Sequence, residues 1–129
     1  MMTETDFANR LSSFMSEYLP HDRNVSKHTL ASYKVAFIDF IIFMEKQKSV
    51  NVNRVMLKHI TRENILDYLH WIETEKGISL TTRNYRLAAV KSFCRFLMYK
   101  DVDRMAQWQN IMSIPKAKTC LLYTSPSPR

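Results

Sequence analysis

Apolar residues recur along most of this 129-residue chain at steps of three and four, the spacing that places side chains on one face of an α-helix. The pattern is clearest over residues 79–100. The apolar positions there are Leu87, Val90, Cys94 and Leu97. Ser79 follows Gly77 and can cap the first turn with its hydroxyl. The pattern therefore predicts a helix over 79–100 with one side in the core.

The same periodicity predicts a first helix over residues 6–19. Its apolar positions are Phe7, Leu11, Phe14, Met15 and Tyr18. We expect this helix to end before Pro20, because the residue that precedes a proline is pushed out of the α region. The polar stretch 20–25 is then predicted to be a loop.

Two further long helices begin at Ser26 and Thr61, whose hydroxyls can cap them. The first is expected to run through about Lys46. The second is expected to run through about Glu75, with Gly77 as its C-terminal stop. Their inward positions are Leu30, Tyr33, Phe37, Phe40, Ile41 and Met44 in the first, and Ile65, Tyr68, Leu69 and Ile72 in the second.

Two shorter stretches complete the pattern. Residues 105–112 predict a short helix. Residues 47–59 form a connection whose conformation the pattern leaves open. Its apolar residues, which we expect to lie over the core, are Val50, Val52, Val55 and Leu57.

The composition supports a helical fold. Hydrophobic residues make up 46% of the chain, and a single Gly beside four Pro favours long helices over turn-rich sheet. The length suits one domain with a core but leaves no room for a separate catalytic domain. We therefore predict an all-α fold, a compact four- to five-helix bundle.

The sequence shows no run of eighteen apolar residues and no leader with a cleavage site, so we expect a soluble, cytoplasmic protein without membrane contact. The two cysteines, Cys94 and Cys120, match no metal spacing or disulfide framework. We expect both to be reduced.

The net charge of +7 is unevenly distributed. Residues 79–100 carry five Lys or Arg and no Asp or Glu, whereas residues 61–76 carry four acidic side chains against two basic ones. A helix that is apolar on one side and otherwise only positive indicates a polyanion as its partner. The acidic segment is an unfavourable face for a nucleic acid.

The chain divides into three parts by composition. Residues 1–114 are expected to form the folded domain. Residues 115–119, with Pro115 and two lysines, have the character of a linker. Residues 120–129 change abruptly in composition and show no cap or period, so we predict that they are a non-native tail.

Two stretches of the chain resemble a known family when they are taken together. The first is Ser26-Lys-His-Thr29-Leu-Ala-Ser-Tyr33, running on to Phe40 and Phe43. The second is Gly77-Ile-Ser-Leu-Thr81-Thr82, followed by Leu87-Ala-Ala-Val90-Lys91-Ser-Phe93-Cys94-Arg-Phe96-Leu97. In this pairing the chain resembles the N-terminal core-binding, or SAM-like, domain of tyrosine recombinases and phage-type integrases. Cys94 is a departure, because family members often carry a larger aromatic residue there.

The resemblance implies a domain that forms half of a C-shaped clamp around double-stranded DNA, with its second and fourth helices in the major groove. In that family DNA integration and recombination are carried out by a separate C-terminal domain, which holds the catalytic residues. The linker 115–119 would lead toward that domain, which is absent from this chain. Other recombinase protomers bound to the DNA are the further partners that the resemblance implies.

The residues most suited to contact DNA lie on the second and fourth helices. They are Lys27, Thr29 and Lys34 in the second helix, and Thr81, Thr82, Arg83, Asn84, Lys91 and Arg95 in the fourth. Lysine, arginine and hydroxyl groups suit phosphate oxygens, arginine can grip guanine, and asparagine can read adenine.

Other roles for these residues remain open on the sequence alone. The cations can equally be a solvated surface, and Ser26 and Thr29 can serve only as helix caps. Arg86 lies nearer the apolar side, where it can form an internal salt bridge as readily as a DNA contact. Tyr33 falls on the inner stripe, so we expect it in the core rather than stacked on a base.

No catalytic, metal or cofactor site is predicted. The four histidines are scattered, and the carboxylates of 61–76 are better explained as a solvated surface than as an acid/base pair. Tyr123 lacks the neighbours that would activate a strand-cleaving tyrosine. We expect neither enzymatic activity from this chain alone nor a small-molecule ligand.

One alternative function belongs to a different class. An all-α protein-interaction module could dock an acidic partner through the same basic helix. A transcription regulator is less favoured, because no short helix-turn-helix spacing surrounds Ser79.

Overall fold

The chain forms nine helical elements in a computed structural model that describes residues 5–117. In order they are α1 (Asp6–Ser13), η1 (Phe14–Asp22), α2 (Lys27–Lys48), η2 (Val52–Arg54), η3 (Leu57–His59), α3 (Arg62–Glu75), α4 (Leu80–Lys100), η4 (Val102–Arg104) and α5 (Met105–Met112). Within the described residues there is no strand, which confirms the predicted all-α bundle. None of the helices in this part of the chain has the length and apolar character that a membrane crossing requires.

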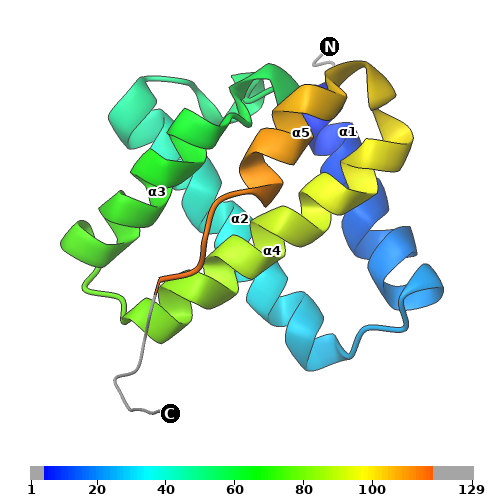
Figure 1. The fold of residues 1–129 in the computed structure, drawn as a ribbon, viewed down its shortest axis with the longest axis horizontal. Helices are drawn as coiled ribbons and strands as arrows, with labels where there is room; N and C mark the ends of the chain where they lie inside the picture. The colour runs from blue at the N-terminus through cyan, green and yellow to red at the C-terminus, as the bar shows by residue number, and fades with distance from the viewer. Residues whose placement is uncertain (1–4, 118–129) are drawn as a thin grey trace, which may run out of the picture.

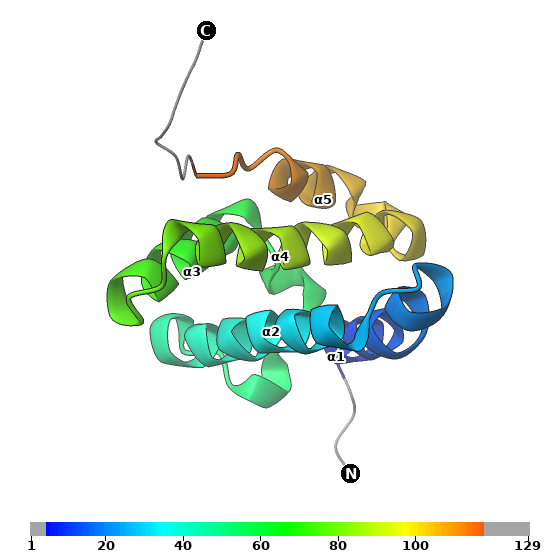
Figure 2. The ribbon, with the colours of Figure 1, turned by 90° about the horizontal axis from the view of Figure 1, so that it is seen from below.

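The two longest helices, α2 and α4, cross one another (Figure 1). Their N-terminal halves diverge toward the lower edge of that view. Figure 2, seen from below, shows the two helices in successive layers, with α5 on the far side of α4. Because α4 contacts α2, α3 and α5, it is the helix that joins the layers.

The predicted inner face of α4 is buried as expected. Its four apolar positions, Leu87, Val90, Cys94 and Leu97, are each at most 2% exposed. Aromatic rings fill the space between the layers: the centroid of Phe93 lies 5.2 Å from that of Phe14 and 5.3 Å from that of Phe37. Such pairs contribute about 0.5–1.5 kcal/mol beyond burial, so this cluster ties η1, α2 and α4 together.

The first helix does not end before Pro20, so that prediction is wrong. Helical structure continues as the π-helix η1, which contains Pro20 and ends at Asp22. A proline lacks the N–H of an α-helical bond and clashes with the carbonyl four residues earlier, and a wider π turn relieves that clash. Burial of Phe14 and Leu19 holds this turn against the core.

The three predicted caps are confirmed. Ser26, Thr61 and Ser79 each accept a hydrogen bond from the backbone N–H three residues on, at 3.1–3.2 Å. Gly77 lies just past α3 with φ +63°, a conformation that favours glycine. The short helix at 105–112 is α5, as predicted.

The connection 47–59 contains the two short turns η2 and η3. Val55 and Leu57 are buried over the core as predicted, whereas Val52 is 48% exposed and does not cover it. Cys94 is buried and free. The predicted linker is described as far as Ala117, and the predicted tail 120–129, with Cys120 and Tyr123, lies outside the described residues.

Candidate nucleic-acid interface

The helices α2 and α4 begin with the same local structure. The Ser26 hydroxyl caps α2 and also donates to the Thr29 hydroxyl at 3.1 Å. The Ser79 hydroxyl caps α4 and donates to the Thr82 hydroxyl at 3.2 Å. Each Ser-x-x-Thr pair occupies the helix end that carries partial positive charge. Thr29 and Thr82 are therefore part of the caps, and both are half-buried.

A groove of about 600 Å³ separates the N-terminal halves of the two helices. It is lined by His28, Thr29, Ser32, Tyr33 and Val35 from α2 and by Thr82, Tyr85, Arg86 and Ala88 from α4. Tyr85 is 69% exposed, whereas Tyr33 is half-buried and stacks on Phe14, as its inner position predicted. The groove lies at the edge toward which the helix starts diverge.

Five of the lining residues were not considered as DNA contacts from the sequence: His28, Ser32, Val35, Tyr85 and Ala88. The signal was present, because His28, Ser32 and Val35 follow one another at four and three residues. That spacing marks a stripe of α2. The stripe carries few charges, and charge guided the choice of candidates.

Three of the candidate residues are exposed cations: Lys27 and Lys34 on α2, and Arg95 on α4. Lys27 and Lys34 are seven residues apart and share one stripe of α2. Lys91 on α4 is half-buried. No ion pair to these four side chains occurs within residues 5–117, and Thr81, also a candidate, is exposed at the start of α4.

Arg83 has an internal partner. Its Nε donates to the Glu73 carboxylate of α3 at 3.1 Å, and its side chain is only 14% exposed. The Nη1 atom is buried and has no hydrogen-bond partner among the described residues. The acidic surface of α3 therefore offsets one of the five charges of α4.

Arg86 is the second cation of α4 that is neutralised within the domain. It forms an ion pair with Asp39 of α2, the internal salt bridge that its sequence position allowed. The hydroxyl of the neighbouring Tyr68 donates to the Ala36 carbonyl at 2.8 Å. This network fixes α2, α3 and α4 beneath the groove.

Asn84 also bonds within the chain. Its Nδ2 donates to the Ala117 carbonyl, and its Oδ1 accepts from the Ala117 N–H, both at 2.9 Å. These two atoms are the ones that an asparagine would present to adenine. The candidate residues thus separate into an exposed set, the half-buried Lys91, a capping set, and two residues, Arg83 and Asn84, with partners inside the domain.

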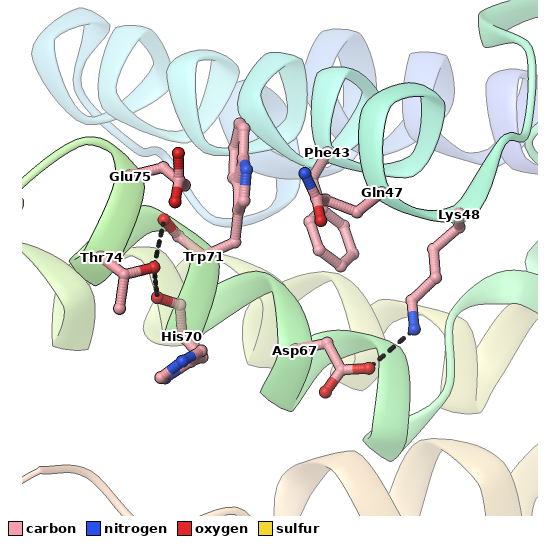
Figure 3. Close-up of a pocket in the computed structure, with 8 residues that line it drawn as sticks. All are labelled: Phe43, Gln47, Lys48, Asp67, His70, Trp71, Thr74 and Glu75. Carbon is pink, nitrogen blue, oxygen red and sulfur yellow. Dashed lines mark hydrogen bonds and ion pairs between the residues drawn. The ribbon is translucent and has the colours of Figure 1, made fainter.

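A second hollow, of about 360 Å³, lies between α3 and the end of α2 that is remote from Ser26 (Figure 3). Its lining residues include Phe43, Gln47, His70, Trp71 and Glu75. Its cation, Lys48, pairs with Asp67 at 2.7 Å. Within residues 5–117 no three His, Cys, Asp or Glu side chains come together as metal ligands. The cation of this hollow is therefore paired, unlike Lys27 and Lys34 nearer the start of α2, which have no ion pair among the described residues.

Comparison with known proteins relates the chain to recombinases. The family described as "Phage integrase, N-terminal SAM-like domain" matches residues 13–101. The integrase/recombinase y4rC of Sinorhizobium fredii is 30% identical over 118 residues, which are 92% of this chain and 36% of that protein. The tyrosine recombinase XerD of Rickettsia bellii is 28% identical over 127 residues, 89% of this chain and 39% of that protein. The chain thus spans less than half the length of these relatives, and no solved structure matches it significantly.

Proposed function

This chain belongs to the phage integrase N-terminal SAM-like domain family, and we propose that it is the DNA-binding N-terminal domain of a tyrosine-type site-specific recombinase. In this proposal the starts of α2 and α4 approach the major groove, and the domain clamps duplex DNA. Strand cleavage and rejoining belong to a C-terminal catalytic domain, for which the longer relatives have enough additional length. The chain itself positions the DNA.

One observation carries the proposal: two serine-capped helix starts share an edge, and cations without an internal partner lie on the same two helices. The candidates among these cations are Lys27, Lys34, Lys91 and Arg95. Lys46 and Lys100, near the C-terminal ends of the two helices, also lack an ion pair within residues 5–117. Hydroxyls, helix N-termini and cations together match the phosphate backbone, and the exposed Tyr85 and Thr81 lie within reach of base edges. Contact by Arg83 would require it to leave Glu73.

Titration of the 129-residue chain against duplex DNA tests the proposal. Four neutralised phosphates predict that log K falls with log salt with a slope of about −3.6 between about 50 and 200 mM salt. Lys34→Gln and Arg95→Gln should each make the slope less negative by about 1. Lys48→Gln removes the same charge from the far end of α2, where Lys48 pairs with Asp67, and should leave the slope unchanged. Absence of binding, or binding that ignores salt, would overturn the proposal and favour an acidic protein partner.

A further inference from the structure

After α5 the chain turns back along α4 (Figure 1). Ile114 is 1% exposed and anchors the start of this return. The chain then passes Pro115 and Lys116 and reaches Asn84, which lies in the second turn of α4. The segment 114–117, which we call the exit segment, therefore lies against the helix that carries most of the candidate DNA contacts.

Asn84 holds the exit segment with both ends of its carboxamide. One end donates to the carbonyl of Ala117 and the other accepts from its N–H, at 2.9 Å each. A single such bond contributes about 1 kcal/mol, but two on one residue fix its orientation as well as its position. Because both groups are occupied, Asn84 has no free edge for a base while the exit segment is in place.

The same stripe of α4 carries two cations. At 100° per residue, Asn84, Lys91 and Arg95 fall within about 40° of one another. Lys116 precedes Ala117, the residue that Asn84 holds, so its side chain lies beside this stripe. Burial lowers the pKa of Lys91, and the positive charges of Lys116 and Arg95 lower it further, so both charges lie close enough to act on Lys91. Without an anion, three such cations repel.

We propose that Asn84 is a positioning residue, which holds the exit segment so that Lys116 joins Lys91 and Arg95 in one binding site for the backbone phosphates of DNA. The proposal rests on the DNA-binding function proposed above and adds Lys116 to its contacts, so the expected wild-type slope changes from about −3.6 for four phosphates to about −4.5 for five. It replaces base reading by Asn84 with an indirect role.

A double-mutant cycle of Asn84→Ala and Lys116→Gln tests this role on duplex DNA. Each single change should make the salt slope less negative by about 1, so a fourfold rise in salt should cost the variant about 3.5-fold less affinity than it costs the wild type. The double variant should match the single variants, because Asn84 acts through Lys116. If Asn84 reads a base instead, its loss will change sequence preference and add to the loss of Lys116, and the proposal fails.

A second variant tests the clasp, by which we mean the two hydrogen bonds between Asn84 and Ala117, without changing Asn84. Ala117→Pro removes the N–H group that donates to Asn84 Oδ1, and it should reproduce the effect of Asn84→Ala on the salt slope. The ¹⁵N heteronuclear NOE of Lys116, measured without DNA, should fall in both variants while far-UV circular dichroism stays that of the wild type. An unchanged NOE would overturn the clasp. If the wild type fails to bind DNA, the proposed function is lost, but the NOE still decides whether Asn84 holds the exit segment.

Discussion

Arg86 of α4 and Asp39 of α2 form an ion pair that links the two helices whose starts form the candidate interface. Their side chains are 14% and 13% exposed, so the pair is largely withdrawn from water. Lys76, at the end of α3, approaches the same carboxylate at 3.9 Å. Arg86 also lines the groove, so the pair joins the two helices at the groove between them.

Arg86→Met should destabilise the domain by about 3 kcal/mol, because it leaves the Asp39 carboxylate in a poorly hydrated place with only Lys76 nearby. Urea unfolding measures the change. Adding Asp39→Leu to this variant should recover at least half of the loss, since two apolar side chains can replace a buried pair. Arg95→Met, an exposed site on the same helix, should change the free energy of unfolding by less than about 0.5 kcal/mol. Equal effects at 86 and 95 would show that the pair contributes little.

The helices could be predicted from sequence because burial and capping act over short distances. The apolar stripe of α4 and the three hydroxyl caps involve residues three or four apart, and each was placed correctly. Pro20 is the exception, because a local rule that ends helices at proline was overridden by burial of Leu19 and Phe14 in the core.

The internal partners of the candidate residues could not be predicted in the same way. Arg83 and Glu73 are ten residues apart, Arg86 and Asp39 are 47 apart, and Asn84 and Ala117 are 33 apart. Such pairs depend on how helices pack, which periodicity does not specify. The sequence could therefore indicate a basic helix but not which of its charges stay free.

Stability should fall at alkaline pH through two buried acids. Burial raises the pKa of Cys94 from 9.0 to about 12, and it raises that of Tyr68 from 10.0 to about 12. Both are neutral when protonated, and the folded state holds the proton more tightly than the unfolded state. Their contribution to the free energy of unfolding is therefore complete below pH 9 and is lost as pH rises toward 12.

Urea unfolding at about pH 8 and about pH 10.5 measures this loss. The higher pH is about 1.5 units above the pKa of Cys94 in the unfolded state. The Cys94 thiol alone should therefore account for about 2 kcal/mol of the fall in the free energy of unfolding. Cys94→Ala should therefore show an alkaline loss that is smaller by about this amount. Parallel pH profiles for the two proteins would contradict the assignment to Cys94.

The cap of α4 allows stability and DNA binding to be separated. Ser79→Ala should cost about 1 kcal/mol, whereas Ser79→Asp keeps a capping oxygen and should remain within about 0.5 kcal/mol of the wild type. The new carboxylate nevertheless faces the proposed phosphate surface, so duplex affinity should fall by at least about tenfold. Thr61→Asp makes the same change at the start of α3, whose cap accepts from Asn64 at 3.1 Å, and should leave affinity unchanged. A loss of affinity for both variants would mean a general charge effect.

The pairing of Arg83 with Glu73 predicts that DNA binding is held back by an internal carboxylate. Glu73→Gln should free the guanidinium at a cost of about 1 kcal/mol in stability, because the pair is partly exposed. The freed charge lies in the first turns of α4, so the salt slope of duplex binding should become more negative by about 1. Glu75→Gln raises the net charge equally from the same helix but has no ion pair with Arg83. If the slope changes in both variants or in neither, Arg83 serves only to hold α3 against α4, and the DNA contacts of α4 reduce to its exposed residues.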